Sequence, residues 1–544
     1  MHCKYRMNWL AILVLFVTVL GVCSIGAIAA DEEKVLVVVQ ATDAGSIDFD
    51  QTSLVGRNMG INVYDWQWLR YRVAEGSNGA LYSDPNELVP GVVQAWRTIL
   101  NEDGTAVQRL VIRPGAVFHS GNPVTAEDLK YTMLRRAALG KHSLHYGVGG
   151  QYPVDCPERP CDVTGLADTI RVIDDYTLEV DVRLAMPSFF ETWTQRWYWD
   201  SELMLQNATE DDPWSTEFAA QNDAGSGPYV IESWTPGVEM VLTRFEEYWG
   251  PRPAIDKIIL RVVPDVSARV LLLQSGEADV ALDLPTEELI SLREDPTVNV
   301  VSAPDINMLY LGMNSNFEPF DNIDVRKALT YAFPYDDIIP AVFEGHAQPF
   351  YGPIPTGVLG ALSDRRYTTD LVLARQHLEA AGYGDGLTIT LQYHSAYAQD
   401  ESIGILYKEN LEEIGVTLEL QKLPAGQHST GKYEQTLPFF IEHARPWIAT
   451  PEYMFRLSFA SDSPSNFTAY QNDVVDQLTP QAVEEFDADT RKDLNAQIQE
   501  EILEDFTWIY VAQPDFEIAM SSKIVGYVAQ NTGFHHWWMV DKLP

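Results

Sequence analysis

Two cysteines and two histidines in one short segment are the residues whose types and spacing could do chemistry. Cys156 and Cys161 are separated by four residues, two of which are prolines. In an oxidising compartment this pair predicts a disulfide that staples a surface loop. His142 and His145 precede the pair, so a metal site with two histidine and two cysteine ligands is the alternative. A thiol assay on the unfolded, unreduced protein distinguishes the two, because free thiols exclude the disulfide.

The remaining chemistry-bearing patterns favour neither a metal nor an enzyme. His535 and His536 are adjacent, and adjacent side chains on a strand point to opposite faces, so they rarely bind one ion together. Arg135 stands where a phosphate loop ending in Gly140-Lys141 needs its first glycine. The sequence has no His-Glu-x-x-His and no Gly-x-Ser-x-Gly motif. We therefore expect no metal, no cofactor and no catalytic residue, with a secreted hydrolase as the alternative.

The N-terminal segment, 1–30, has the pattern of a signal peptide. Two basic residues precede the uncharged apolar run Trp9 to Val22, and Ala27-Ile28-Ala29 offers the small residues of a cleavage site. The run is shorter than the ~20 residues of a membrane-spanning helix. We expect a protein of the periplasm or of the extracellular face of the cell membrane. The segment before Cys23 loosely resembles a lipobox, so a lipid anchor on Cys23 is the alternative to simple cleavage.

Composition and charge describe a large globular protein. The chain has 544 residues, 46% of them hydrophobic, and a formal net charge of −41. Such a field repels nucleic acid and anionic lipid, so we expect neither as a partner. The length suffices for two to four domain-sized units.

Strand and helix patterns alternate without a regular repeat, which predicts an α/β or mixed architecture. Thr125 and Thr369 are candidate N-caps, with Asp128 at the third position of its helix. Strands are expected at 34–40, 94–100, 107–112, 170–173, 177–182, 238–244, 258–263, 308–313, 387–392, 416–421 and 506–512, and helices at 64–69, 125–136, 268–275, 324–331, 370–381, 401–414 and 490–504.

Several distinct motifs follow one another along the chain. They are Arg113 to Asp128 (RPGAVFHSGNPVTAED), Gly225 to Tyr229 (GSGPY), Leu273 to Asp279 (LQSGEAD), Pro319 to Ala328 (PFDNIDVRKA) and Leu411 to Val416 (LEEIGV). The ordered set resembles the family 5 extracellular solute-binding proteins of ABC transporters, the group of peptide- and nickel-binding receptors. Most of these residues are turn glycines, caps and core aromatics, so the resemblance indicates a fold rather than a ligand.

The resemblance implies a two-lobed periplasmic binding protein fold, α/β with mixed sheets flanked by helices and an extra inserted subdomain. By likeness, lobe I would comprise 31–78, 222–303 and 512–544, the inserted subdomain 79–221, and lobe II 304–511. A ligand would lie buried between the lobes. The implied partners are a small-molecule or peptide ligand and the ABC permease subunits in the membrane, and the receptor itself would be a monomer.

The resemblance also implies ligand-binding residues in lobe II. In peptide-binding members, a Trp-x-x-Asp element places its aspartate at the α-ammonium group of the ligand. The matching stretch here is Trp447 to Thr450, so a threonine replaces the acid. A neutral hydroxyl cannot form the charge-assisted hydrogen bond that an ammonium group needs. Glu452, two residues further on, is the candidate substitute.

Three more positions match places where family members present ligand contacts. Tyr393 and His394 follow a strand end, with a solvated loop as the alternative, and Tyr510 could equally be an ordinary core tyrosine. We expect an extracytoplasmic receptor of an ABC importer for short peptides or peptide-like solutes that acts by ligand-induced lobe closure. The replaced acid at Thr450 and the 14 tryptophans favour an oligosaccharide receptor as the alternative. A surface protein without a transport role is a third class.

Overall fold

The computed structural model describes residues 33–64, 68–139, 160–182 and 186–544. The expected signal peptide, Cys23, His142, His145 and Cys156 lie outside the described residues. Within the described part of the chain, no helix has the length and apolar character needed to cross a membrane.

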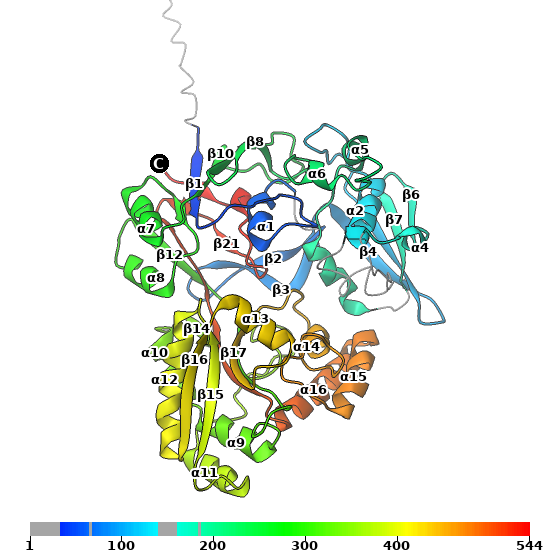
Figure 1. Ribbon diagram of the computed structural model, residues 1–544. Helices are drawn as coiled ribbons and strands as arrows, with labels where there is room; N and C mark the ends of the chain where they lie inside the picture. Colours follow the sequence, from blue (N-terminus) through cyan, green and yellow to red (C-terminus); the bar gives the residue numbers. More distant parts are fainter. Residues whose placement is uncertain (1–32, 65–67, 140–159, 183–185) are drawn as a thin grey trace, which may run out of the picture. The chain divides into compact units, whose positions relative to one another are not determined.

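A seven-stranded sheet with β1 near its centre forms the core of the part that we call the first lobe. Its order is β12-β19-β11-β1-β10-β9-β8 (Figure 1). β1 pairs in parallel with β10 and β11, and its VLVVVQ sequence suits a strand that is covered on both faces. The strands are β1 (Val35–Gln40), β8 (Tyr229–Thr235), β9 (Glu239–Arg244), β10 (Lys257–Val262), β11 (Val280–Ala281), β12 (Val298–Ala303) and β19 (Phe516–Ser521), with the helices α1 (Leu54–Gly60), α7 (Val266–Ser275) and α8 (Thr286–Leu292).

A four-stranded antiparallel sheet, β4-β5-β7-β6, which with its helices we count as part of the first lobe, contains the two hairpins that the sequence predicts. α2 packs on β6 and β7, and its first turn is closed by Asp128, whose carboxylate accepts hydrogen bonds from the main-chain N–H and the hydroxyl of Thr125. The elements of this region are β4 (Val93–Leu100), β5 (Ala106–Ile112), α2 (Ala126–Leu139), α4 (Thr164–Ala167), β6 (Ile170–Asp174), β7 (Thr177–Val182), η1 (Pro187–Gln195), α5 (Ser201–Gln206) and α6 (Thr216–Ala219). Smaller sheets join β2 (Leu69–Glu75) to β3 (Leu81–Pro90) and β21 (Val528–Ala529), and β20 (Ile524–Val525) to β22 (Asp541–Lys542), with η2 (Trp537–Met539) between the last two strands.

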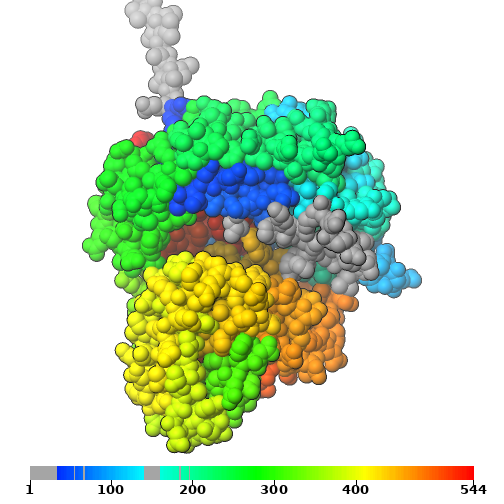
Figure 2. Space-filling view, in the orientation of Figure 1, coloured from blue at the N-terminus to red at the C-terminus, as the bar shows by residue number. Residues whose placement is uncertain are grey.

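A six-stranded sheet, β14-β18-β13-β17-β15-β16, forms the core of the part that we call the second lobe. Helices flank this sheet (Figure 1), and residues around 390–420 form a continuous yellow surface on the face shown in Figure 2. The strands are β13 (Met308–Met313), β14 (Ala347–Pro349), β15 (Leu387–His394), β16 (Val416–Leu423), β17 (Phe439–Ala444) and β18 (Trp508–Pro514). The helices are α9 (Ile323–Ala332), α10 (Tyr335–Val342), α11 (Leu371–Ala380), α12 (Ala398–Glu413), α13 (Ala425–Tyr433), α14 (Pro451–Ser458), α15 (Asp473–Glu484) and α16 (Ala488–Glu504).

The chain passes between the two large sheets twice, and the two crossings are tied to each other. The first runs from β12 to β13 and the second from β18 to β19, and each strand pairs antiparallel with its counterpart in the other crossing. The buried Gln513 side chain donates a hydrogen bond from Nε2 to the carbonyl oxygen of Asp305, 3.0 Å away. The ranges given above for the lobes and the inserted subdomain stay a prediction.

Two of the sequence motifs meet in the first lobe. His119 lies 2.8 Å from the carboxylate of Asp223 through Nδ1 and 2.9 Å from the carbonyl oxygen of Gly227 through Nε2. A Cβ on Gly225 would lie 2.1 Å from the carbonyl oxygen of Val63, and one on Gly227 equally clashes with main chain. These glycines are therefore needed because two backbone segments approach each other closely.

Three local predictions were wrong. The segment 64–69 is not a helix where it is described: Tyr64 lies in a turn after α1, and Leu69 begins β2. Trp68 in this segment is a core residue, whose Nε1 donates to the carbonyl oxygen of Trp197 at 2.8 Å. Asp370, not Thr369, caps α11, because its carboxylate accepts from the N–H of Leu373. The strand expected at 506–512 begins at residue 508.

Candidate functional site

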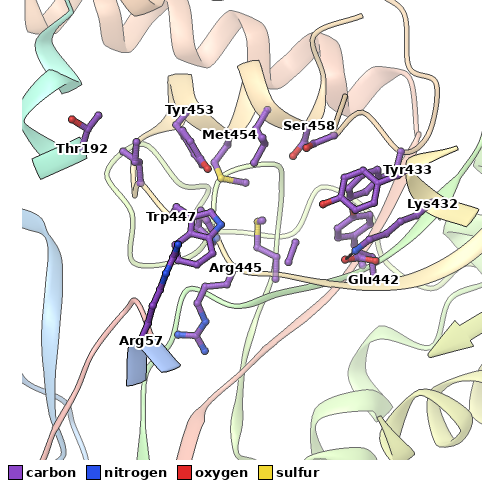
Figure 3. A pocket seen from close by; sticks show the side chains of 18 of the residues that line it. Arg57, Thr192, Lys432, Tyr433, Glu442, Arg445, Trp447, Tyr453, Met454 and Ser458 are labelled. Atoms are coloured by element: carbon purple, nitrogen blue, oxygen red, sulfur yellow. Dashed lines mark hydrogen bonds and ion pairs between the residues drawn. The ribbon is translucent and has the colours of Figure 1, made fainter. Parts of the chain in front are cut away.

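A cavity of approximately 500 Å³ is lined by residues of both lobes. This volume is typical of small-molecule sites, which are about 300–1,000 Å³. Figure 3 shows the side chains that surround it. The first lobe contributes Thr52, Ser53, Arg57, Arg136, Thr192 and Arg196, and the second lobe contributes an aromatic and charged wall that includes Tyr310, Lys432, Tyr433, Glu442, Arg445, Trp447, Tyr453 and Phe467.

Aromatic rings make up much of the wall from the second lobe. Trp447 follows β17 and is 41% exposed, which is high for so large an apolar side chain. Tyr433, at the end of α13, meets the ring of Phe467 edge to face, with 5.0 Å between centroids. Rings of this kind can stack on the planar groups of a ligand while their polar atoms stay available for hydrogen bonds.

Two of the cations in the second-lobe wall are matched by carboxylates. Lys432 Nζ lies 2.5 Å from Oε1 of Glu442. Burial raises the pKa of Glu442, and the Lys432 charge opposes that rise. Arg445 makes a two-pronged contact with Asp305, in which Nη1 and Oδ1 are 2.9 Å apart. Because Asp305 lies in the first crossing, Arg445 connects the cavity wall to the segment that joins the lobes.

Three arginines approach the cavity from the first lobe. Arg57 lies in the last turn of α1, Arg136 in the last turn of α2, and Arg196 directly after η1. The last turn of a helix favours a cation because the helix dipole is negative there. The guanidinium carbons of Arg57 and Arg136 lie 5.8 and 4.5 Å from the ring centroid of the buried Trp197.

The surroundings lower the pKa of all three arginines. Burial is the main cause in each case, and it lowers the pKa of Arg196 to about 10. The neighbouring charges of Arg196 and Arg57 lower the pKa of Arg136 further, whereas Asp50 raises it. A region where burial and like charge weaken the charged form is one that an anion would stabilise.

The structure places the residues of the Trp-x-x-Asp-like element in two different cavities. Trp447 lines the 500 Å³ cavity, whereas Thr450 and Glu452 line a second cavity of approximately 450 Å³. Glu452 is 5% exposed, accepts a 2.6 Å hydrogen bond from Nδ2 of Asn495, and lies 3.6 Å from Nε of Arg491. The chain changes direction at Thr450, where α14 begins, and this separates the two ends of the element.

The other three predicted positions do not line the 500 Å³ cavity. Tyr510 is buried on β18 beside the ring of Phe350, and burial raises its pKa. Tyr393 is buried on β15, and His394 ends that strand, where its Nδ1 accepts a 3.0 Å hydrogen bond from the N–H of Ala396. Their roles as ligand contacts stay predictions.

Sequence reasoning missed the charged residues of the cavity. Arg57, Arg136 and Arg196 belong to three segments without a shared motif, and Lys432, Glu442 and Arg445 lie outside the family motifs quoted above. The available signal was compositional: the chain has 37 basic against 78 acidic residues, so a cluster of arginines stands out once the fold brings it together.

The adjacent histidines are structural in the described part of the chain. They lie before η2 and not on a strand, so the predicted reason for their separation was wrong. His535 Nδ1 lies 2.7 Å from the Tyr527 hydroxyl, and His536 Nδ1 accepts from Nε1 of Trp538 at 3.2 Å. Among the described residues, no group of His, Cys, Asp and Glu side chains is arranged to hold a metal ion. Cys161 is buried, and its predicted partner lies outside the described residues.

Comparison with known proteins identifies the family. The pattern of the bacterial extracellular solute-binding proteins, family 5, matches residues 87–466. This chain belongs to that family. It is 24% identical over 508 residues to the probable D,D-dipeptide-binding periplasmic protein DdpA of Escherichia coli K12, with 92% of each chain covered. It is 26% identical over 437 residues to the glutathione-binding protein GsiB of Pectobacterium atrosepticum, covering 78% of this chain and 80% of the relative.

Solved structures show that the fold is that of the two-domain periplasmic binding proteins. The substrate-binding protein CtaP of Listeria monocytogenes superposes with a TM-score of 0.79 at 20% identity, over 94% of this chain and 100% of that one. DppA of Helicobacter pylori, in complex with the peptide STSA, superposes with a TM-score of 0.72 at 22% identity, over 94% and 98%. The expected fold class and family are therefore confirmed.

Proposed function

We propose that this protein is an extracytoplasmic receptor that delivers a short peptide or peptide-like solute to an ABC importer. The observation that carries the proposal is the cavity of approximately 500 Å³ that both lobes line, with an exposed tryptophan and paired charges in its wall. The names of two relatives, for D,D-dipeptides and for glutathione, and the peptide-bound DppA structure support this ligand class.

The proposed mechanism is lobe closure around the ligand. Ligand groups that contact both walls gain some of those contacts only when the lobes are together, so binding shifts the open–closed equilibrium. The two crossings between the lobes are the segments that would bend, and the Gln513 to Asp305 hydrogen bond keeps them moving together. The ABC permease subunits would then recognise the closed form. This function requires no covalent chemistry, cofactor or metal.

Trp447 is the residue that we propose as the principal stacking surface. It projects from the loop after β17 into the cavity, and Ser458, Ser465 and Thr192 line the same space with hydroxyl groups. A peptide plane stacked on an indole and bonded to hydroxyls fits this combination. We keep Thr450, Glu452, Tyr510, Tyr393 and His394 as proposed ligand contacts that the same experiments can test.

A thermal-shift screen tests the ligand class. Di- to pentapeptides should raise the unfolding midpoint of the native protein by mass action, and cello- and xylo-oligosaccharides should not. Trp447→Ala should weaken the binding of a responding peptide by about tenfold or more, equivalent to about 1.4 kcal/mol. Phe486→Ala is the matched control, since Phe486 is an exposed aromatic residue that does not line the cavity. A response to sugars alone would refute the peptide assignment.

The remaining expectations about the cellular setting are part of the same proposal. We propose that residues 1–30 are removed on export, with a lipid on Cys23 as the alternative, and that the receptor acts as a monomer in the periplasm or on the extracellular face of the membrane. Mass spectrometry of the protein isolated from its native envelope distinguishes cleavage after Ala29 or Ala30 from a lipidated Cys23. Loss of peptide uptake in a deletion strain would separate a transport receptor from a surface protein of another role.

A further inference from the structure

We propose that the ligand is anionic: a peptide or peptide-like solute whose side-chain carboxylate is bound by the guanidinium groups of Arg57, Arg136 and Arg196. This inference rests on the proposed function and specifies the ligand class of the same cavity.

The three arginines converge on the cavity from separate elements. Each lines the cavity, and two of them pack over the same buried indole, that of Trp197. Arg57 is only 7% exposed, and its Nε has no hydrogen-bond partner in the part of the chain that the structure describes. A buried guanidinium N–H without a partner is costly unless a ligand accepts its hydrogen bond. Guanidinium groups bind carboxylates with particularly good geometry, through two parallel hydrogen bonds.

The two nearby protein carboxylates, Asp48 and Asp50, both bind a different arginine, Arg135. Asp50 is the carboxylate that attracts all three arginines. Its Oδ2 accepts from Nη1 of Arg135 at 2.5 Å and from Nε1 of Trp199 at 3.0 Å, whereas its buried Oδ1 has no hydrogen-bond partner among the described residues. Asp48 binds Arg135 as well, through both carboxylate oxygens. Four buried guanidinium groups, including that of Arg135, thus lie in the field of these two aspartates. The excess positive charge would be balanced by a further anion.

The described wall from the second lobe offers a cationic ligand no carboxylate that lacks a basic partner. Among the described residues that line the cavity, Glu442 carries the carboxylate, and it pairs with Lys432. Asp305 is likewise held by Arg445. The acid of the family's Trp-x-x-Asp element is replaced by Thr450, which lines the other cavity. A net positive peptide would find repulsion at the first lobe and no free acid in the second.

Calorimetric titration of the full-length protein with two isosteric dipeptides tests the inference. Glu-Glu and Gln-Gln differ in charge but scarcely in shape, so we expect Glu-Glu to bind at least tenfold more tightly. Equal binding, or tighter binding of Gln-Gln, would overturn the anionic assignment while leaving the peptide receptor intact. Absence of binding by either dipeptide and by the longer peptides of the thermal-shift screen would overturn both.

Variants assign the effect to the arginines. Arg57→Gln should lower the affinity for Glu-Glu at least tenfold and leave the affinity for Gln-Gln nearly unchanged. Arg252→Gln is the matched control, because Arg252 is exposed, pairs with Glu246 and does not line the cavity. The ligand-free unfolding midpoint of Arg57→Gln should stay the same or rise, since the change removes a buried like charge. Equal losses for both dipeptides would mean that Arg57 has a structural role only, and the inference would fail.

Discussion

Replacing Arg445 by glutamine should destabilise the protein in a way that depends strongly on pH. Arg445 donates to both carboxylate oxygens of Asp305 and to the carbonyl oxygen of Asn531, 3.2 Å away. The Asp305 side chain is only 3% exposed. Burial raises the pKa of Asp305, and the Arg445 charge opposes that rise. Removing the charge therefore raises the pKa of Asp305 further.

The magnitude follows from what the buried carboxyl group can do instead. When its charge becomes too costly, Asp305 takes up a proton. The loss in the free energy of unfolding therefore cannot exceed the free energy needed to protonate an aspartate of ordinary pKa at the same pH. With an unfolded-state pKa of about 3.9, that limit is about 1.36 × 3.1, or about 4 kcal/mol, at pH 7, and about 1.5 kcal/mol at pH 5. Loss of one partner of a buried ion pair typically costs about 3–5 kcal/mol. Because the pKa of Asp305 is already raised in the wild type, the loss of stability at pH 7 should stay below the limit, at about 2–4 kcal/mol.

Urea unfolding of the wild type, Arg445→Gln, Asp305→Asn and the double variant at pH 5 and pH 7 measures this effect. A carboxyl group whose pKa is raised in the folded state destabilises the fold increasingly as pH rises above its unfolded-state pKa. The difference in unfolding free energy between the wild type and Arg445→Gln must therefore grow from pH 5 to pH 7. The double variant should recover part of the loss, since it has no buried charge. A deficit that is equal at both pH values would refute the account of a stranded carboxylate.

Three further predictions concern a glycine, a histidine–aspartate pair and the two cysteines. Gly227→Ala should lower the free energy of unfolding by about 3 kcal/mol, because its Cβ would lie 2.5 Å from a main-chain oxygen; unchanged urea unfolding would contradict the close backbone packing. Burial is the largest influence on the pKa of His119 and lowers it, but the Asp223 charge and the hydrogen bonds to Asp223 and Gly227 together outweigh burial, so the pKa is raised. The pair therefore stabilises the fold fully below about pH 6.5 and less as pH rises through the folded pKa. Asp223→Asn should therefore cost about 1–3 kcal/mol at pH 6 and less at pH 9, and an NMR titration should show a lower pKa for His119. Unfolded, unreduced protein lacking residues 1–30 should contain no free thiol if Cys156 and Cys161 form the predicted disulfide, and two free thiols would exclude it.

Much of the fold was determined by local sequence signals. The β4–β5 hairpin, the strand Met308–Met313 and the helix capped by Gly276 were all predicted, because a turn glycine, a short continuous apolar run and a C-cap act over a few neighbouring residues. The ordered family motifs were sufficient for the two-lobed architecture. The segment at 64–69 was mistaken for a helix because the contacts of its described residues, such as that of Trp68 with Trp197, involve residues that are distant in the sequence.

The tertiary structure decided which residues surround the cavity. Arg57, Arg136 and Arg196 come from three separate elements, and Arg57 and Arg136 meet over the ring of Trp197 only after α1 and α2 have packed against the segment that follows η1. Sequence proximity was misleading in the opposite direction, since Trp447 and Glu452 are five positions apart and line different cavities. The physical reason is that caps, turns and strand periodicity depend on short-range sterics and hydrogen bonds, whereas the charge and shape of a cavity depend on long-range packing.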